Sequence, residues 1–463
     1  MGNMSLFANR KINFLLLIDI TLLVYLSVFV SAFSSLDDTG LMEDLQKGAL
    51  NFASLAPSGG MTYLRPMTLL TYLVDFNLWG AHPVAFHLTN LILHLANACL
   101  VYHLCRTCLP ESPKREGSAF LSALFFAVSP LNSESVLWVS GRTDSLCCFF
   151  FLCSLLVVVN ERLAPLSAAG TLLILYSFSL LAKESSFALL GIVPFYLLTV
   201  ADRRTRVAKW VLSGTVAIVS ASYLLLRLGP RGELDSGTSK IVTKIAHQSV
   251  LELAYKSLAA FGFYLKKMAW PFPLNLAIQS IYEPFYAAVG IVAVLVIISC
   301  FVRFKVSRLP LLIIVFCLGP PLLALHGSIP WTLYAERYLY LSMTGTALLV
   351  GLLAAKSRRI PQPLPFLLII PLAITTIHRS GQWADPVALW RDTVTNSPGL
   401  PQAHVVYAYE LIQAGRIADA KKSLQRAREM KFENDLYRTC MTTINRDEGG
   451  RQASSPPKDS KAQ

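Results

Sequence analysis

The stretch FYAAVGIVAVLVIISCFV, residues 285–302, has no charged side chain along its whole length. As a helix it rises about 27 Å, close to the hydrocarbon thickness of a bilayer, about 30 Å. Inside that layer a backbone must satisfy its own hydrogen bonds, and a helix does so within one segment. This stretch therefore predicts a membrane-spanning helix.

Similar apolar runs recur throughout the 463 residues, so we expect a bundle of about eleven spans. They are predicted at about 12–33, 84–108, 118–131, 144–160, 166–181, 186–201, 209–227, 285–302, 309–326, 336–355 and 361–378. The composition agrees, because 54% of the residues are hydrophobic, 15% are charged and the mean hydropathy is +0.51. Soluble domains carry about 25% charged residues. The sequence predicts an all-α polytopic membrane protein.

The net charge of +13 comes mainly from short loops between the apolar runs. Such loops orient a membrane protein, because Lys and Arg gather on its cytoplasmic side. With Arg10 and Lys11 placed inside, ahead of a retained first span, four more basic loops fall on that side. They are Arg106/Lys114/Arg115, Arg203/Arg204/Arg206, Arg303/Lys305/Arg308 and Lys356/Arg358/Arg359. The charge therefore indicates topology, and nucleic acid is not expected as a partner.

Two amphipathic segments, 65–80 and 251–270, are expected to lie on the outer side without crossing. A full span at 251–270 would move the later basic loops to the outside. Their mixed polarity is typical of helices at a membrane interface.

A few polar residues lie inside the predicted spans. Asp19, in the first span, is expected to pair within the bundle. His87, Asn90, His94 and Asn97 recur at three- and four-residue steps and therefore share one side of a helix. This stripe favours hydrogen bonds between packed helices over its alternative, a metal or proton path.

From Gln382 onward the sequence resembles a soluble protein. Residues 401–432 hold two helical patterns divided at Gly415, with small residues where paired helices cross, and resemble one tetratricopeptide repeat. Helix 384–398 is expected to pack on it, since a lone repeat cannot bury its own face. We predict a transmembrane catalytic domain at 1–380, a short helical tail on the outer side at 381–436 and a disordered C-terminus at 437–463.

With this topology, acidic and basic residues from five loops meet on the outer face of the bundle. A carboxylate there suits a general base for an acceptor hydroxyl, and the cations suit a phosphate leaving group. Together they predict transfer of a sugar from a lipid-linked phosphate donor. The candidates are Asp37, Asp38, Arg65, Glu134, Arg142, Asp144, Lys183, Glu184, Glu336 and Arg337.

Structural alternatives exist for several of these residues. Asp37 and Asp38 are also good N-caps for a helix that starts near residue 40. The neighbours Lys183 and Glu184 form an ion pair in the simplest structural alternative, as do Glu336 and Arg337.

Four motifs, in order, resemble the transmembrane-and-tetratricopeptide O-mannosyltransferase family and its bacterial relatives, which are GT-C glycosyltransferases. They are YLRPMTLLTYLV and its continuation (63–104), SPLNSESVLWVSGRTDSL (129–146), LLAKESS (180–186) and YAERYLYLS (334–342). The resemblance implies a GT-C bundle that transfers a hexose, mannose in the family, with inversion from a polyprenyl-phosphate donor. It also implies a protein or glycan acceptor and contact with membrane lipids.

The resemblance implies roles for individual residues. The catalytic carboxylate of the family's acidic pair falls on Asp37 and Asp38, with Asp37 preferred as the base. Donor phosphate and substrate binding fall on the remaining motif positions. These are Arg65, Glu134, Arg142, Asp144, Lys183, Glu184, Glu336, Arg337 and Tyr338.

The sequence departs from the family at two points. Its loop reads Ser129-Pro130-Leu131-Asn132 where relatives carry histidine, and its repeat array has about one unit. No cofactor is assigned, and a divalent metal (Mg or Mn) held by the second aspartate is left open.

Two other functions remain as alternatives: a flippase or transporter of a lipid-linked sugar, and a non-catalytic membrane scaffold. The expected location is a bacterial inner membrane with the site facing the periplasm. The alternative location is the endoplasmic reticulum membrane, with the site facing the lumen.

Overall fold

The computed structural model describes residues 7, 9–55, 64–228, 236–327, 332–357 and 364–454. It contains two compact units, Met1–Ala384 and Asp385–Gln463. The first unit is built from sixteen described α-helices. They are α1 (Arg10–Val24), α2 (Asp38–Gln46), α3 (Pro66–Trp79), α4 (Pro83–Cys108), α5 (Arg115–Ala127), α6 (Ser133–Leu137), α7 (Arg142–Val159), α8 (Pro165–Ala182), α9 (Ala188–Thr199), α10 (Arg206–Arg227), α11 (Ser236–Ala246), α12 (Val250–Ala269), α13 (Glu283–Arg303), α14 (Arg308–Gly327), α15 (Tyr340–Lys356) and α16 (Ile369–Ala384).

The predicted all-α membrane fold is confirmed. Eight helices among the described residues are long and apolar enough to cross a membrane. They are Pro83–Cys108, Val139–Val159, Pro165–Ala182, Arg206–Arg227, Glu283–Arg303, Lys305–His326, Glu336–Lys356 and Leu364–Ala384. The pair Arg115–Ala127 and Pro130–Leu137, bent by 49°, is a ninth if it forms one span.

The predicted number of eleven spans is not confirmed. The first predicted span contains α1, which has 15 residues, followed by the 3-10 turn Leu26–Phe29. Glu184–Thr199 is apolar but also shorter than a typical span. Both segments are apolar helices, as predicted, but each is shorter than the eight helices that are long enough to cross a membrane.

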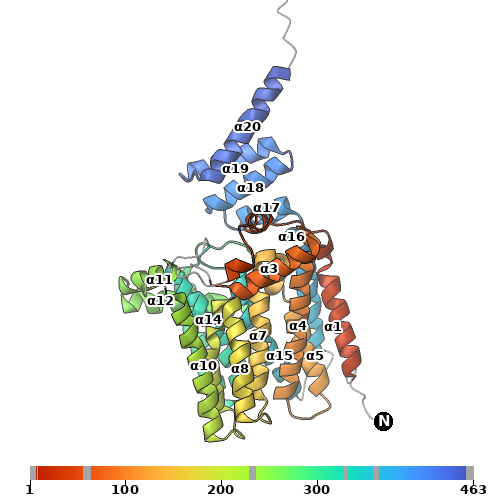
Figure 1. Cartoon of the computed structure of the whole chain (residues 1–463), viewed down its shortest axis with the longest axis vertical. Helices are drawn as coiled ribbons and strands as arrows, with labels where there is room; N and C mark the ends of the chain where they lie inside the picture. The colour runs from red at the N-terminus through yellow and green to blue at the C-terminus, as the bar shows by residue number, and fades with distance from the viewer. Residues whose placement is uncertain are drawn as a thin grey trace, which may run out of the picture. The chain divides into compact units, whose positions relative to one another are not determined.

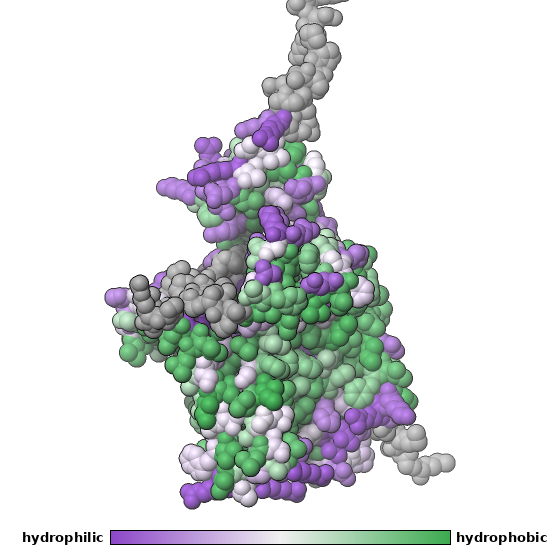
Figure 2. Space-filling view, in the orientation of Figure 1, coloured by the Kyte–Doolittle hydropathy of each residue, from purple (hydrophilic) through white to green (hydrophobic). Residues whose placement is uncertain are grey.

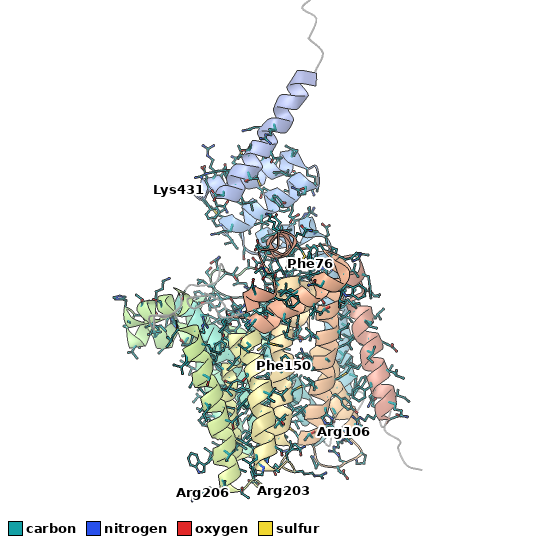
Figure 3. All side chains as sticks on the ribbon, in the orientation of Figure 1. Phe76, Arg106, Phe150, Arg203, Arg206 and Lys431 are labelled. Carbon is teal, nitrogen blue, oxygen red and sulfur yellow. The ribbon has the colours of Figure 1, made fainter. Side chains whose placement is uncertain are left out.

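The helices of the first unit form an elongated bundle. Figure 1 shows α1, α4, α5, α7, α8 and α10 running along one direction, while α3 lies across one end. Figure 2 shows a broad hydrophobic surface along the bundle and hydrophilic residues at the end that lies away from α3. Arg106, Arg203 and Arg206 lie at that same end in Figure 3, so three of the predicted basic positions share one side.

The segment 251–270 is the helix α12, which packs closely on α13. A Cβ at Gly262 would lie 2.0 Å from the Tyr286 carbonyl oxygen, and one at Gly290 would lie 2.4 Å from the Leu258 carbonyl oxygen. The two backbones therefore approach each other at a point where only glycine fits.

The polar stripe on α4 makes the helix-packing contacts that we predicted. All four side chains are buried, and each hydrogen-bonds to a neighbouring segment. His94 Nδ1 lies 2.8 Å from the Tyr340 hydroxyl, and its Nε2 lies 3.0 Å from the Ala127 carbonyl oxygen. Asn97 Nδ2 donates to the Ser145 carbonyl oxygen at 2.8 Å.

The prediction for Asp19 is wrong. Its side chain lies on the exposed side of α1, whereas Asn13, Leu17, Thr21 and Val24 form the buried side. No described residue forms an ion pair or a side-chain hydrogen bond with it. The helical period, about 3.6 residues per turn, turns Asp19 away from the bundle.

The second unit contains α17 (Pro386–Asn396), α18 (Pro401–Gln413), α19 (Ile417–Glu429) and α20 (Asp435–Ser454). The two helices predicted within 401–432 are α18 and α19, joined at Gly415, whose φ of +73° favours glycine. Small and apolar residues of α18 and α19, among them Ala408 and Ala420, form the core of the pair.

The expected disorder from residue 437 onward is wrong for the part that the structure describes. Helix α20 continues to Ser454, and it buries Tyr437, Cys440 and Ile444 in the core of the second unit. These residues recur at steps of three and four, which is one side of a helix. The highly polar composition around them concealed this pattern. Residues 455–463 lie outside the described residues.

Candidate active site

The two adjacent aspartates occupy different environments at the start of α2. Asp37 takes the N-cap position without a side-chain cap hydrogen bond, and it is exposed. Asp38 is fully buried. Its Oδ1 accepts hydrogen bonds from the Ser140 backbone N–H at 3.0 Å and the Ser140 hydroxyl at 2.8 Å, and its Oδ2 accepts one from Ser34 N–H at 3.1 Å. Asp38 thus connects the segment of Ser34 to the loop of Ser140, whereas the side chain of Asp37 is accessible to solvent.

Both carboxyls have raised pKa values. Burial raises the pKa of Asp38 to about 6, although the hydrogen bonds from Ser140 and Ser34 act in the opposite direction. Partial loss of hydration also raises the pKa of Asp37, and the positive charge of Arg337 opposes that change. Asp37 and Arg337 therefore lie within electrostatic reach of each other.

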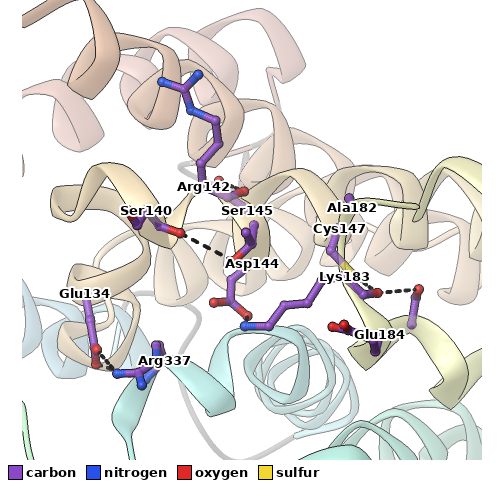
Figure 4. A network of polar contacts seen from close by, with 12 residues as sticks. Glu134, Ser140, Arg142, Asp144, Ser145, Cys147, Ala182, Lys183, Glu184 and Arg337 are labelled. Carbon is purple, nitrogen blue, oxygen red and sulfur yellow. Dashed lines mark hydrogen bonds and ion pairs between the residues drawn. The ribbon is translucent and has the colours of Figure 1, made fainter. Parts of the chain in front are cut away.

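Glu134, in α6, forms a buried ion pair with Arg337, in the 3-10 turn Glu336–Leu339. Nη1 of Arg337 lies 2.5 Å from Oε1 of Glu134, and the Arg337 backbone N–H donates to Oε2 at 3.2 Å (Figure 4). The Arg337 guanidinium also lies over the rings of Trp138 and Tyr338, at 5.3 and 5.0 Å. These contacts fix the cation beside the loop of the acidic pair.

A second ion pair joins α7 to the end of α8. Nζ of Lys183 lies 2.6 Å from Oδ1 of Asp144, and both side chains are largely buried (Figure 4). The same ammonium lies 5.9 Å from the centroid of the Tyr338 ring. Tyr338 therefore stands between two cations, Lys183 and Arg337.

Glu184 directs its carboxylate to two arginines. Its Oε2 lies 2.8 Å from Nη2 of Arg65, and its Oε1 lies 3.6 Å from Nη1 of Arg227. The side chains of Arg65 and Glu184 are 25% and 21% exposed, so this pair is accessible in part. Arg65 directly precedes α3, and Arg227 ends α10.

Glu336 forms a separate, almost completely buried pair. Its Oε1 accepts from Nζ of Lys267, in α12, at 2.7 Å and from the Asn275 backbone N–H at 2.9 Å. Lys267 also donates to the carbonyl oxygens of Pro271 and Pro273. This carboxylate ties α12 and its following loop to the start of α15.

Arg142 has a structural environment that differs from the predicted phosphate contact. It is completely buried, and its Nη1 lies 2.6 Å from Oδ2 of Asp75. Its Nε donates to Asn90 and its Nη2 to the Phe86 carbonyl oxygen, both at 2.8 Å. Figure 4 shows Arg142 pointing away from Asp144. The guanidinium joins α3, α4 and α7, and protein atoms surround it.

The structure corrects the ion pairs that we considered between sequence neighbours. Lys183 pairs with Asp144, and Glu184 pairs with Arg65. In the same way Glu336 and Arg337 have different partners, on α12 and α6. Adjacent residues in a helical turn point in different directions, so each joins a different part of the bundle.

Sequence reasoning missed four residues of this network: Asp75, Ser140, Arg227 and Lys267. One signal was available, because Asp75 is the only charged residue between Pro66 and Trp79. An isolated charge on an otherwise apolar helix is a recognised sign of a buried partner. Ser140 carries no such signal.

The residues do not fit a metal centre built on the second aspartate. Both oxygens of Asp38 already accept hydrogen bonds from Ser34 and Ser140. Among the described residues there is no group of three or more His, Cys, Asp or Glu side chains placed to hold an ion. We therefore assign no metal-dependent step to these residues.

Known proteins with similar sequences belong to the family that the motifs resemble. The chain is 32% identical over 154 residues to protein O-mannosyl-transferase TMTC1 of Mus musculus, covering 31% of this chain and 16% of that protein. It is 34% identical over 146 residues to protein O-mannosyl-transferase TMTC4 of Homo sapiens, and this match covers 28% of this chain and 20% of that protein. These relatives are protein O-mannosyl-transferases. The resemblance predicted from the motifs is therefore confirmed at the level of sequence similarity.

A longer match covers most of the chain. Protein O-mannosyl-transferase F38B6.6 of Caenorhabditis elegans is 23% identical over 453 residues, covering 89% of this chain and 61% of that protein. The chain thus spans less than two thirds of the length of each of these relatives. No family model matches the sequence.

Among solved structures, the chain is similar to ArnT from Cupriavidus metallidurans bound to undecaprenyl phosphate. It is 13% identical with a TM-score of 0.44, covering 96% of this chain and 81% of that chain.

Proposed function

We propose that the chain is a membrane glycosyltransferase. It transfers a hexose, mannose by analogy with the relatives, from a polyprenyl-phosphate donor to an acceptor hydroxyl with inversion. The observation that carries this proposal is the exposed carboxylate of Asp37, on which the positive charge of Arg337 acts, together with the ion pairs that hold Arg65, Lys183 and Arg337 in place. The similarity to protein O-mannosyl-transferases supports the same reaction class and a protein acceptor.

Asp37 is the general base of the proposed reaction. Its carboxylate takes the proton of the acceptor hydroxyl as the hydroxyl oxygen bonds to the anomeric carbon. The bond from that carbon to the phosphate oxygen breaks, and its electron pair leaves with the polyprenyl phosphate. Attack from the face opposite the phosphate inverts the anomeric centre.

The departing phosphate needs positive charge, and three predicted residues supply it. Arg65 has the most accessible charge, because its side chain is 25% exposed, while Lys183 and Arg337 are more deeply placed. Each cation is held by a carboxylate, on Glu184, Asp144 or Glu134 respectively. Cations fixed in this way stabilise developing charge without reorganising during the reaction.

Asp38 and Arg142 position the catalytic loop in this proposal. Asp38 holds the loop of Ser140 against the loop that carries Asp37. Arg142 binds α3 to α4 directly after the loop of Ser140. Losing either contact would displace the base or the cations relative to each other, and a small misplacement costs much of the rate.

The site is proposed to face the side opposite the basic loops, which is the outer side under the predicted topology. A bacterial inner membrane with a periplasmic site remains the prediction, with the lumen of the endoplasmic reticulum as the alternative. The hydrophobic surface of the bundle in Figure 2 fits direct contact with membrane lipids.

The reaction class is tested with full-length protein in lipid vesicles and a radiolabelled polyprenyl-phosphate hexose. Turnover with release of free polyprenyl phosphate, and transfer of label to an acceptor peptide rich in Ser and Thr, are the expected results. Movement of intact labelled lipid between leaflets without release would identify a flippase instead. Binding without either activity would favour the scaffold alternative.

A further inference from the structure

One carboxylate oxygen of Asp144 has no role in the proposed reaction. Asp144 lies in the first turn of α7, and its side chain is 3% exposed. Its Oδ1 accepts a hydrogen bond from Nζ of Lys183 at 2.6 Å, whereas its Oδ2 has no hydrogen-bond donor among the described residues. Figure 4 shows this second oxygen on the side of Arg337, away from Lys183.

A buried carboxylate oxygen without a donor is costly, because it loses its hydration and nothing replaces it. Buried polar atoms in folded proteins almost always have a partner. Other carboxylates of the network follow this rule. Both oxygens of Glu134 accept from Arg337, and both oxygens of Asp38 accept from serine residues. Asp144 differs from them, and its second oxygen therefore suits a hydrogen-bond donor on a ligand.

A ligand can approach this oxygen beside Tyr338. The ammonium of Lys183 lies 5.9 Å from the centroid of the Tyr338 ring, and the guanidinium of Arg337 lies 5.0 Å from it. Asp144 is within electrostatic reach of both Arg337 and Tyr338. Because the side chain of Tyr338 is only partly buried, a ligand that contacts it from the solvent comes close to Asp144 and to both cations.

The charge of the carboxylate decides which chemical group fits its second oxygen. A phosphate is itself an anion, so Asp144 repels it and the cations bind it. A hydroxyl group is neutral and donates, and its hydrogen bond to a charged oxygen is a strong one. The proposed donor lipid carries both groups, with phosphate on the anomeric carbon of the sugar and hydroxyls on the other ring carbons.

We propose that Oδ2 of Asp144 accepts a hydrogen bond from the hydroxyl at carbon C2 of the donor hexose. This inference rests on the proposed function and adds a sugar-selecting contact to it. The C2 hydroxyl is bonded to the carbon next to the anomeric carbon, so it lies close to the phosphate that Lys183 binds in the proposed reaction. Since Lys183 and Asp144 form one ion pair, the pair contacts the phosphate and the neighbouring hydroxyl together. Asp144 is thus a specificity-determining residue.

The test measures binding, so it does not require turnover. Dissociation constants are measured with full-length protein in phosphatidylcholine vesicles for radiolabelled polyprenyl-phosphate mannose and for its 2-deoxy and 6-deoxy analogues. Wild type should bind the 2-deoxy lipid about thirtyfold more weakly than the parent lipid, the usual effect of losing one hydrogen bond to a charged group. The 6-deoxy lipid should bind like the parent.

Asp144→Asn keeps an oxygen for Lys183 and places an amide nitrogen at the position of Oδ2. The weakening caused by 2-deoxy substitution should then fall to about fivefold, because a neutral hydrogen bond is roughly half as strong as a charge-assisted one. Ser145→Ala is the matched control. The Ser145 hydroxyl lies in the same turn of α7 and donates to the Arg142 carbonyl oxygen at 3.1 Å. Its loss should leave the thirtyfold difference unchanged.

Polyprenyl phosphate without a sugar distinguishes this contact from a purely structural role. Asp144→Asn should bind it at least as tightly as wild type, because the variant removes a negative charge near the phosphate. If Asp144 only positioned Lys183, Asp144→Asn would weaken the lipids with and without the sugar by the same factor, and the proposal would fail.

Three further results would overturn the proposal. Wild type would bind the parent and 2-deoxy lipids equally if a water molecule occupies the site beside Oδ2. Asp144→Asn could retain the full thirtyfold difference, or wild type could select for the C6 hydroxyl instead. Turnover of the parent lipid decides the proposed function separately. Selective binding without turnover would support the hydroxyl contact and reject the transferase, and wild type that binds none of the lipids would reject both.

Discussion

At the scale of single residues, the acidic pair separates two tasks between adjacent carboxylates. Asp37 keeps an accessible face, while Asp38 is buried under three hydrogen bonds. In the proposed reaction Asp37 therefore contacts the acceptor, while Asp38 holds the loop. The sequence pair alone cannot express this difference, since both residues have the same chemistry.

The raised pKa of Asp38 predicts a pH-dependent stability. Because its pKa is about 6 in the fold and near 3.8 ordinarily, the fold disfavours the ionised form. The contribution of Asp38 to the free energy of unfolding is therefore greatest below pH 4, falls as the pH rises to about 6 and is constant above that pH. The free energy of unfolding is expected to fall by about 3 kcal/mol over this range.

Thermal unfolding of purified protein between pH 4 and 7 measures this effect. The difference in unfolding midpoint between wild type and Asp38→Asn should fall steadily between pH 4 and 6. Parallel curves for the two proteins would show that Asp38 does not titrate in this range.

At the scale of helices, Arg142 connects α3, α4 and α7 through Asp75, Asn90 and the Phe86 carbonyl. Arg142→Gln leaves the Asp75 carboxylate buried without its cation, which typically costs about 3–5 kcal/mol. We expect a large fall in the unfolding midpoint, and recovery of most of it when Asp75→Asn is added.

The same variants distinguish a structural Arg142 from a phosphate ligand. If Arg142 gripped the donor, Arg142→Gln would keep the wild-type unfolding midpoint and raise the KM for the lipid donor. Adding Asp75→Asn would then restore nothing.

The contact between α12 and α13 gives a second prediction at this scale. Gly262→Ala forces a Cβ toward the Tyr286 carbonyl and should destabilise the fold by about 1–3 kcal/mol. Gly214→Ala is the control, because nothing lies within 4 Å of a Cβ there and alanine favours a helix.

Unfolding midpoints of the two glycine variants decide the matter. Gly262→Ala should unfold at a lower temperature than wild type, and Gly214→Ala at the same or a higher temperature. Equal behaviour of the two would mean that α12 moves freely on α13.

At the scale of the whole molecule, periodicity and charge predict the helices but not their partners. The apolar stretch 285–302 became the spanning helix α13, and the stripe on α4 makes interhelical contacts as expected. The ion pairs were less predictable. Lys183 and Glu184 are adjacent in sequence, yet their partners Asp144 and Arg65 are 39 and 119 residues away. Such distant pairings follow from how the helices pack, which one sequence does not specify.

Two segments show where composition misleads. Helix α20 looks polar enough for disorder, yet Tyr437, Cys440 and Ile444 bury one side of it. Asp19 lies in a run apolar enough for a span, yet the turn of α1 exposes its carboxylate. In both segments the side of the helix on which a residue lies decides its burial, and the average polarity of the segment does not.

The central claim, that Asp37 is the general base, is tested most directly by one comparison. Turnover of a radiolabelled polyprenyl-phosphate hexose is measured for wild type, Asp37→Asn and Asp44→Asn in vesicles. Asp44 is an exposed aspartate of the same helix α2, so it controls for the loss of one negative charge nearby. We expect Asp37→Asn to lose at least about a hundredfold in kcat with an unchanged unfolding midpoint, and Asp44→Asn to match wild type. Wild-type turnover in Asp37→Asn would contradict the account.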